Sequence, residues 1–470
     1  MELISGIGIA ALVTLIVAAL FVRPQDRGTR FQRFWERWQV MNRFHKGLLI
    51  DGAGRNRLSA KNSFEHVAVI SPTGGGKTTR YIVPNLLSLD DCSMVVTDPS
   101  GEIYQQTAGY LEKKGFKIEV LNLEEPGKSR GYNPVAKATT FTEIDKLAAV
   151  LMRSANPVVK PGDEIWFEEP QTLLAVLLRC LKETKDYANL ANLLYLLQNF
   201  GDDGKSLEDL LSRYAPDEAT INQFKGFISG NDRMRAAFLT TARNALRIFG
   251  NPEIAAMTSR DEIDFHALRD EKTVLYLIVP ETDAKFYSFI VNCFFMQFFE
   301  AQKQLQYKSQ GLPIYVLFDE FGQYYVPDFD TISTTIRKFR VSLSIIIQDP
   351  IQLVDRYGQN TASTILSGGI RTKLFYAGLD LQTSETVERM LGRVKVGTRE
   401  ENLMNADRIR RLDVKKGILV TSNQEPILFR ARPFYQDRSM KRKTRIKKER
   451  GQKKIRPSTL AYFPLNNSES

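Results

Sequence analysis

The stretch VISPTGGGKTT, Val69–Thr79, decides the fold because it has the form of a phosphate-binding loop. A strand predicted over His66–Ile70 leads into a glycine-rich turn, and a helix is predicted from Lys77 onward. Consecutive glycines let backbone N–H groups converge on phosphate oxygens, and the helix N-terminus adds a favourable dipole. The residues expected to bind the nucleotide here are Ser71, Pro72, Thr73, Gly74, Gly75, Gly76, Lys77, Thr78 and Thr79.

One residue of this loop departs from the usual pattern, because Ser71 stands where the first glycine is normally found. Ser71 is the outermost position, where the chain leaves the strand, and a serine fits there if its φ is negative. Lys77 is expected to reach the β- and γ-phosphates, and Thr78 to offer its hydroxyl to Mg²⁺. The loop therefore predicts a working site for a magnesium nucleotide rather than a Gly-rich turn with an incidental lysine.

A pair of carboxylates ends a second predicted strand. In PIYVLFDE, the strand Ile314–Phe318 is followed directly by Asp319 and Glu320. In nucleotide hydrolases of this kind the aspartate orders the Mg²⁺ shell, and the glutamate polarises the attacking water. Gln348 follows the strand predicted over Leu343–Ile347. Because adjacent parallel strands open into one crevice at their C-terminal ends, we expect Gln348 to sense the γ-phosphate or to position water there.

Two further polar features are candidates for the same site. Asp98 ends the strand predicted over Ser93–Thr97, and it is either a residue of the nucleotide site or the cap of the turn that follows. Arg337 and Arg340 lie at the end of a predicted helix just upstream of the strand that precedes Gln348. In a ring of subunits, one of these arginines can reach a neighbour's nucleotide as an arginine finger.

Short apolar runs rich in Val and Ile recur along the chain, and helical patterns lie between most of them. Because these runs do not alternate with polar residues, they predict an α/β fold with a mostly parallel sheet covered on both faces. The predicted strands are His66–Ile70, Ser93–Thr97, Lys117–Leu123, Thr273–Val279, Ile314–Phe318, Leu343–Ile347 and Lys373–Ala377. A hairpin of Gly417–Thr421 and Pro426–Arg430 is expected to close the core.

Strand patterns vanish between about Glu143 and Arg260, where Leu/Ala-rich helical periodicity predicts an inserted all-α domain. Examples of this periodicity are Thr172–Leu181, Leu190–Phe200 and Met234–Ile248. The expected boundaries are a membrane anchor over 1–23, a basic juxtamembrane segment over 24–60, a nucleotide-binding domain in two halves over 61–142 and 261–436, the all-α domain over 143–260, and a basic tail, expected to be disordered, over 437–470.

The N-terminal segment Leu3–Val22 carries no charged residue, and its length is sufficient for one transmembrane helix. A cleaved signal peptide is the competing interpretation, but only Met1 and Glu2 precede the apolar run, where a signal peptide has basic residues. Arginines follow from Arg23 to Arg37, and the positive-inside rule places that side in the cytoplasm. We therefore expect a single-pass membrane protein, with its N-terminus outside and the rest of the chain in the cytoplasm.

Positive charge is concentrated near the C-terminus. The net charge of the 470 residues is +11, and residues 437–456 hold eleven Lys/Arg against two acidic residues. Such a tail either solubilises the chain or binds an anionic partner, a nucleic acid or a membrane surface. The three cysteines and three histidines are scattered, so the sequence predicts neither a disulfide framework nor a zinc site.

Other segments accompany the loop in a fixed order: IVPNLL (Ile82–Leu87), TDPSGE (Thr97–Glu102), GYNPV (Gly131–Val135), LFDEFG (Leu317–Gly322), VPDF (Val326–Phe329), SIIIQDPIQLVDRYG (Ser344–Gly358) and TKLFYAG (Thr372–Gly378). Together they resemble the coupling-protein ATPases of conjugation and type IV secretion, the TraG/TraD family. The resemblance covers both halves of the α/β core. It implies a RecA-like P-loop NTPase core and agrees with an inserted all-α domain.

The resemblance also implies a function. ATP and Mg²⁺ are the implied cofactors, and the implied assembly is a membrane-anchored homo-hexamer. ATP hydrolysis is implied to move single-stranded DNA, without sequence preference, and its attached relaxase toward a type IV secretion channel. On that pattern Thr78 and Asp319 hold Mg²⁺. The residues implied to be catalytic are Lys77, Asp319, Glu320, Gln348 and Arg337, with Arg340 as the fallback for the finger.

Two departures from the family and two other functions stay open. Many relatives have two membrane helices, whereas one is predicted here, and the tail is basic where several relatives have an acidic one. This tail is expected to hold DNA or anionic lipid.

One alternative function is a chromosome-segregation or DNA-packaging motor with the same core. The other is a docking platform, switched by ATP, that recruits protein effectors through the all-α domain.

Overall fold

The computed structural model describes the chain between residues 29 and 465, with internal gaps. The described ranges are 29–53, 56–154, 162, 164–201, 203–396, 399–421, 423–448 and 460–465. The membrane helix predicted over Leu3–Val22 lies outside them. No helix within these ranges combines the length and the apolar character needed to cross a bilayer.

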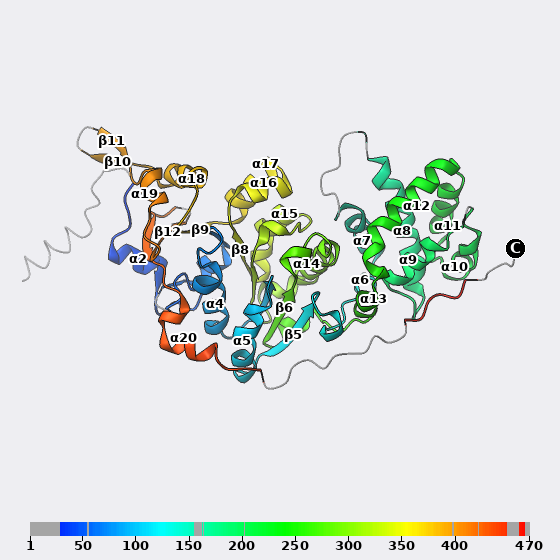
Figure 1. The fold of residues 1–470 in the computed structure, drawn as a ribbon, viewed down its shortest axis with the longest axis horizontal. Helices are drawn as coiled ribbons and strands as arrows, with labels where there is room; N and C mark the ends of the chain where they lie inside the picture. Colours follow the sequence, from blue (N-terminus) through cyan, green and yellow to red (C-terminus); the bar gives the residue numbers. More distant parts are fainter. Residues whose placement is uncertain are drawn as a thin grey trace, which may run out of the picture.

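A nine-stranded sheet runs through the larger part of the molecule (Figure 1). Its strands lie in the order β13-β12-β9-β3-β8-β7-β4-β6-β5. All neighbours from β9 to β5 are parallel, whereas β12 and β13 are antiparallel. The strands are β3 (Val67–Ile70), β4 (Ser93–Asp98), β5 (Lys117–Asn122), β6 (Thr273–Ile278), β7 (Ile314–Phe318), β8 (Val341–Ile347), β9 (Thr372–Tyr376), β12 (Lys416–Thr421) and β13 (Ile427–Arg430).

The predicted strands and the C-terminal hairpin are thus present, with ends that differ by two residues or fewer. Successive residues of β3 alternate between two separate hydrophobic clusters, so both faces of the sheet are covered. This burial on two faces explains why the strands read as continuous apolar runs. The helices that flank the sheet include α4 (Val83–Ser88), α5 (Glu102–Lys113), α14 (Ser288–Gln302), α15 (Phe329–Thr335), α16 (Ile351–Tyr357) and α18 (Leu381–Leu391).

A helical region lies at the β5 edge of the sheet and occupies the chain between β5 and β6 (Figure 1). Its described residues form helices and no strand. The helices are α6 (Pro134–Lys137), α7 (Phe141–Arg153), α8 (Ile165–Glu183), α9 (Leu190–Gln198), α10 (Glu208–Tyr214), α11 (Glu218–Ile228), α12 (Asp232–Leu246) and α13 (Pro252–Thr258). The sequence periodicity therefore identified the main helices, although the domain boundaries themselves stay a prediction.

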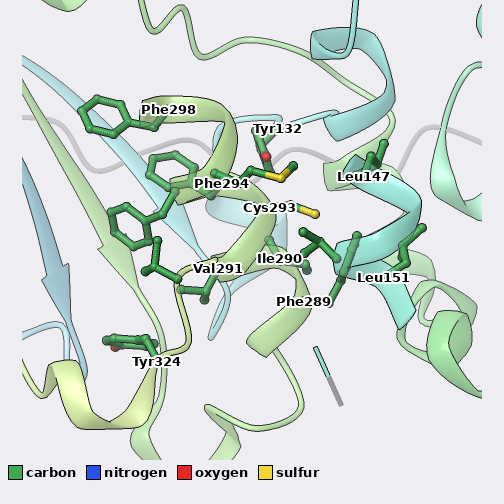
Figure 2. Packing of buried hydrophobic residues seen from close by; sticks show 14 of the residues in the cluster. Tyr132, Leu147, Leu151, Phe289, Ile290, Val291, Cys293, Phe294, Phe298 and Tyr324 are labelled. Carbon is green, nitrogen blue, oxygen red and sulfur yellow. The ribbon is translucent and has the colours of Figure 1, made fainter. Parts of the chain in front are cut away.

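The helical region packs against the sheet through α14. Leu147 and Leu151 of α7 belong to the same hydrophobic cluster as Phe289 and Cys293 of the neighbouring helix α14, and all four side chains are buried (Figure 2). The opposite side of α14 contacts the sheet, where the rings of Phe295 and Phe318 lie 4.5 Å apart. A helix buried on both sides explains why the α14 sequence, SFIVNCFFMQFFEAQ, is apolar almost all round.

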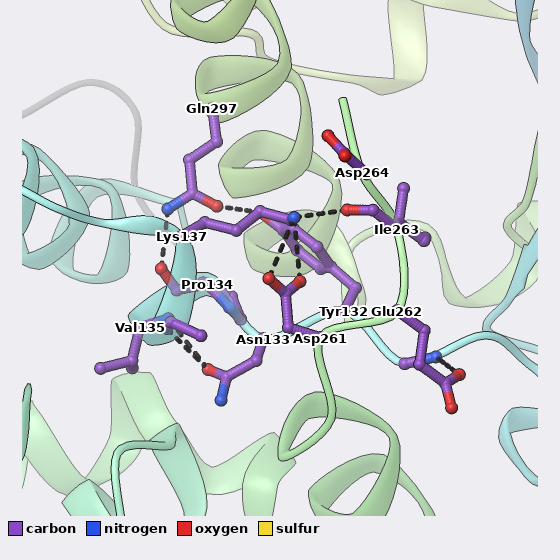
Figure 3. A network of polar contacts seen from close by, with 12 residues as sticks. Tyr132, Asn133, Pro134, Val135, Lys137, Asp261, Glu262, Ile263, Asp264 and Gln297 are labelled. Atoms are coloured by element: carbon purple, nitrogen blue, oxygen red, sulfur yellow. Dashed lines mark hydrogen bonds and ion pairs between the residues drawn. The ribbon is translucent and has the colours of Figure 1, made fainter. Parts of the chain in front are cut away.

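Two connections join the helical region to the sheet side by side (Figure 3). The backbone N–H of Glu262 donates to the carbonyl of Gly131 at 3.0 Å. Lys137 forms an ion pair with Asp261 at 2.9 Å, and Gln297 of α14 donates to a carbonyl at the start of α6. These polar contacts hold the outgoing and returning segments of the insertion together.

Smaller elements were not anticipated from the sequence. Two short antiparallel ribbons are present, β1 (Met41–Asn42) with β2 (Arg57–Leu58) and β10 (Arg393–Val396) with β11 (Arg399–Asn402). β10 reads RVKV and β11 reads REEN, so each strand is short and β11 has no apolar residue. The remaining short helices are α2 (Phe34–Val40), α3 (Ala60–Phe64), α17 (Gln359–Ser363), α19 (Ala406–Arg410) and α20 (Arg438–Lys443).

The expectation of disorder does not hold for the described parts of the 437–470 tail. Asp437 caps α20, where its carboxylate accepts the N–H of Met440 at 3.0 Å. Lys443 lies over the Tyr110 ring of α5, and the backbone near Ile446 approaches Gly109 of α5 so closely that a Cβ there would lie 2.3 Å from the Ile446 carbonyl oxygen. The Lys443 ammonium also donates to the Leu87 carbonyl at 3.0 Å, a contact that composition alone does not show.

Candidate functional site

The phosphate-binding loop connects β3 to a helix, as its sequence predicts. Gly74 and Gly76 have φ values of +74° and +79°, which glycine adopts without steric cost. A Cβ on Gly75 would lie 2.1 Å from the Ser71 hydroxyl oxygen. The φ of Ser71 is not positive, and its N–H donates to the carbonyl of Ile347 at 3.1 Å. A serine therefore fits at the strand exit, and the missing glycine does not disturb the loop.

Lys77, Glu320 and Gln348 meet at the carboxyl ends of neighbouring strands. Lys77 Nζ lies 2.6 Å from Glu320 Oε1, and Gln348 Nε2 donates to the other oxygen, Oε2, at 3.1 Å. The three residues follow β3, β7 and β8, which are adjacent in the sheet. Glu320 has a φ of +52°, an uncommon value for a residue with a side chain, and such strain tends to occur at functional sites. The predicted convergence of these three side chains is thus observed.

Asp319 and Thr78 form the second contact between the loop and β7. Thr78 Oγ1 donates to Asp319 Oδ2 at 3.1 Å, and the Asp319 carbonyl accepts the hydroxyl of Thr97 at 2.9 Å. Burial, together with the neighbouring Glu320 carboxylate, raises the pKa of Asp319 to about 7. Two carboxylates at one buried site disfavour full ionisation, and a cation placed between them would relieve that repulsion.

Asp98 lies near this site and also caps a helix. Its Oδ2 accepts the N–H of Tyr104 at 2.8 Å, at the start of α5. Its other oxygen is buried and has no hydrogen-bond partner within the described part of the chain. Burial raises the pKa of Asp98 to about 6, and the charge of Asp98 contributes to the raised pKa of Asp319. The cap interpretation therefore holds for one oxygen, while a role for Asp98 in the nucleotide site stays a prediction.

The two candidate finger arginines do not approach the site of their own chain. Arg337 is exposed on the helical turn Ile336–Phe339, which precedes β8, whereas Gln348 follows β8. At ~3.3 Å per residue, the strand separates the two ends by roughly 20 Å. Arg340 has a φ of +58° and donates to the Gly311 carbonyl at 2.7 Å. Of the two, Arg337 keeps an exposed guanidinium.

Sequence reasoning missed Arg80, which lies against the loop. Its guanidinium donates to the carbonyls of Gly75, Ala431 and Val414, so it ties the loop to the segments that flank β12 and β13. Arg80 lies in a wide helical turn, Thr78–Ile82, of the kind often found at functional sites. An arginine three residues after the loop lysine is the only sequence signal that pointed to it.

The residues of this edge fit a magnesium nucleotide. Glycines with positive φ form a turn that leaves no room for a Cβ at its centre, and an ammonium group, a hydroxyl and two carboxylates lie beside it. Hydroxyl and carboxylate oxygens are the ligands that Mg²⁺ prefers, and Mg²⁺ in such sites is shared with phosphate oxygens. The donor set therefore matches what the sequence predicted for this loop.

The chain is similar to proteins of conjugative DNA transfer. The family model for conjugative DNA transfer by the type IV secretory system matches residues 36–458. The sequence is 24% identical to protein VirD4 of Rhizobium radiobacter over 410 residues, which cover 80% of this chain and 58% of VirD4. It is 27% identical to the conjugal transfer protein TraG of Escherichia coli over 237 residues, which cover 47% of this chain and 36% of TraG. The chain thus spans less than two-thirds of the length of these curated relatives.

The fold is similar to that of the plasmid coupling protein TrwB in complex with ADP and Mg²⁺. The TM-score is 0.66 at 16% sequence identity, with 92% of this chain and 96% of that chain covered. A sulfate complex of TrwBdeltaN70 gives a TM-score of 0.67 at 16% identity, with 87% and 94% covered. The predicted α/β core with a mostly parallel sheet is confirmed by this likeness. Because the family model matches almost the whole described chain, the resemblance seen in the sequence is also confirmed, and the chain belongs to the type IV secretory system family of conjugative DNA transfer proteins.

Proposed function

We propose that this chain is a membrane-anchored ATPase that couples single-stranded DNA, with its attached relaxase, to a type IV secretion channel. The observation that carries the proposal is the meeting of Lys77, Glu320 and Gln348 beside a phosphate-binding loop, in a member of the conjugative DNA transfer family. The similar structures of TrwB include complexes with ADP and Mg²⁺ and with a non-hydrolysable ATP analogue. ATP and Mg²⁺ are therefore the proposed ligands of this site.

Each side chain of the site has a proposed role. Lys77 exchanges Glu320 for the β- and γ-phosphates, while Thr78 and Asp319 would hold Mg²⁺. Mg²⁺ supplies positive charge that offsets the charge on the phosphate oxygens. Glu320 orients the attacking water and accepts its proton, and Gln348 holds the Glu320 carboxylate in place.

A homo-hexamer, in which several such sites act in turn, is the proposed assembly. In this proposal Arg337 serves a neighbouring subunit's nucleotide, which is supported by its exposure in the turn that precedes β8, at the end of the strand opposite to its own site. DNA binding in this proposal is independent of sequence and rests on phosphate contacts, with basic residues of the tail as contributors. Anchoring in the inner membrane by residues 1–23 belongs to the same proposal.

The test is steady-state ATP hydrolysis by the full chain, with and without single-stranded DNA. We expect hydrolysis to increase several-fold with DNA, and Lys77→Ala to abolish it because the charge contact with the γ-phosphate is lost. Lys61→Ala, at an exposed lysine of α3, is the matched control and should hydrolyse ATP at the wild-type rate. Wild-type turnover by Lys77→Ala would remove this site from the reaction.

The same experiment separates the DNA motor from the docking platform. Hydrolysis that no DNA stimulates, together with tight binding of an effector protein to the helical region, would favour the platform. A salt-dependent affinity for single-stranded DNA that does not change with sequence would favour the motor, because phosphate contacts release counterions.

A further inference from the structure

A short C-terminal segment, Leu460–Leu465, lies on the surface of the helical region, far from the sheet that precedes it in the chain. Its sequence is LAYFPL. In Figure 1 the segment is drawn in red and runs beside α9 and α10. Phe463 belongs to the main hydrophobic cluster, and Leu460 and Leu465 pack partly buried against it. Nothing in the proposed ATPase chemistry uses these contacts.

One buried side chain forms hydrogen bonds with the backbone of this segment. Asn192, in α9, is fully buried. Its Oδ1 accepts the N–H of Phe463 at 2.8 Å, and its Nδ2 donates to the carbonyl of Ala461 at 3.1 Å. The same Nδ2 also donates to Asn189 Oδ1 at 3.3 Å, which fixes the orientation of the amide. An amide that pairs with an N–H and a carbonyl two residues apart recognises an extended peptide whatever its side chains are.

A pocket beside Asn192 holds one aromatic side chain. Phe463 is 3% exposed, and its ring meets the edges or faces of two tyrosines at steep angles. The ring centroids lie 5.5 Å from Tyr187 and 5.9 Å from Tyr214, with interplanar angles of 81° and 83°. Such edge-to-face contacts favour an aromatic ring over an aliphatic side chain of similar size. Hydrogen bonds to the backbone of a segment, beside a pocket for one of its side chains, are the two features by which proteins bind extended peptides.

The segment lies on this surface rather than inside the fold. Ala461, Tyr462 and Pro464 are exposed, and Phe463 is the one residue of Leu460–Leu465 that is buried. Tyr462 stacks on the outside against Tyr195, with ring centroids 4.8 Å apart. A surface segment with one buried side chain, a few partly exposed contacts and two hydrogen bonds to Asn192 opens more easily than a core element does.

We propose that the helical region carries a peptide-binding site, formed by Asn192 and the pocket of Tyr187 and Tyr214, and that the chain's own segment Leu460–Leu465 occupies it as a tethered, displaceable ligand. The site takes an extended peptide with an aromatic residue at the Phe463 position. Tethering gives the segment an effective concentration of about 1 mM or more, so a free peptide at micromolar concentration does not compete with it. Release of the segment exposes the site to a peptide from another protein.

The test uses the full chain and a fluorescein-labelled synthetic peptide, LAYFPL, followed by fluorescence anisotropy. We expect Phe463→Ala to bind the probe at least tenfold more tightly than the wild type, because its own segment no longer fills the pocket. Adding Asn192→Ala to this variant should weaken the probe at least tenfold. Asn199→Ala, at an exposed asparagine that follows the same helix, is the matched control and should change nothing. A probe with alanine in place of its phenylalanine should not bind.

Hydrogen exchange gives an independent reading that does not depend on the probe. The Phe463 amide should exchange at least tenfold faster in Asn192→Ala than in the wild type, and in the wild type it should exchange faster than the core amides of α9. Equal probe binding by the wild type and Phe463→Ala, or probe binding that Asn192→Ala leaves unchanged, would overturn the peptide site. A Phe463 amide as protected as those of α9 would overturn displacement. Wild-type probe affinity that rises on dilution would show that a second copy's segment fills the site, which would overturn the intramolecular arrangement.

Discussion

Replacing Glu320 by glutamine should separate nucleotide binding from hydrolysis. The Glu320 carboxylate holds the Lys77 ammonium at 2.6 Å, and the two side chains are only 14% and 6% exposed. Lys77 has to leave this carboxylate before it contacts a phosphate. Glu320→Gln removes the charge that competes for Lys77 and also removes the base that accepts a proton from water.

The size of both effects can be estimated from this contact. Bonds to charged groups contribute about 1.5–3 kcal/mol and bonds between neutral groups about half of that, so removing the charge of one partner lowers the contribution by about 1 kcal/mol. The amide of glutamine still accepts from the charged Lys77, and the loss of the Glu320 charge therefore corresponds to roughly fivefold tighter ATP binding. Loss of the general base should lower turnover by about 10²- to 10⁴-fold.

The assay is a titration with a fluorescent ATP analogue in the presence of Mg²⁺, alongside steady-state hydrolysis. Glu281→Gln is the matched control, because Glu281 is exposed and accepts from Gln323 at 2.9 Å, in the turn that follows Glu320. This control should bind and hydrolyse ATP like the wild type. It therefore separates the contact with Lys77 from a general change of charge near the site.

Two results would refute the reasoning. Weaker nucleotide binding by Glu320→Gln would show that the ion pair with Lys77 does not compete with phosphate. Turnover within tenfold of the wild type would show that Glu320 is not the proton acceptor. In the second case Gln348, which donates to Glu320 at 3.1 Å, would be the next residue to replace.

Three further predictions concern stability and the loop. Burial lowers the pKa of His66 to about 3, below its unfolded value, so its stabilising contribution is present above pH 6.5 and is lost as the pH falls. Between pH 6.5 and 5 the wild type should lose about 2 kcal/mol more unfolding free energy than His66→Asn, as measured by chemical denaturation at each pH. An equal loss in the two proteins would contradict this. Ser71→Gly should leave ATP affinity within about threefold, since the buried Ser71 hydroxyl has no partner in the described chain; a larger loss in the titration would assign it a role. Asn133→Ala removes the cap of α6 and a hydrogen bond to the Ala188 carbonyl at 2.8 Å, which should cost about 1–2 kcal/mol in chemical denaturation, and an unchanged midpoint would argue against that cap.

The parts of the site that a local pattern encodes were predictable. The strands β3, β7 and β8 are apolar runs that end in a polar residue, and parallel strands bring such ends to one edge. The loop between Ser71 and Lys77 has its own turn chemistry, because only glycine tolerates the φ values at Gly74 and Gly76. Side chains placed by strand ends and turns follow from sequence because their positions depend on neighbours in the chain.

Contacts between distant segments were not predictable in the same way. Three features of the site depend on segments that pack together from distant parts of the chain. They are the left-handed backbone of Glu320, the contacts of the Arg80 guanidinium, and the hydrogen bond by which Asp98 caps α5. The strands of the ribbon β10–β11 have four residues each, and only β10 contains apolar residues, so the pattern is too short to identify the ribbon from sequence.

The tail shows the same division most clearly. Its composition is basic, and composition of that kind predicts a solvated, disordered chain. The sequence by itself determined an α/β core with a phosphate-binding loop and a helical insertion, since each of these has a local period or turn. Only the tertiary structure decided that Phe463 lies in a pocket of the helical region beside Asn192, because the two residues are brought together by packing across 271 positions of the chain.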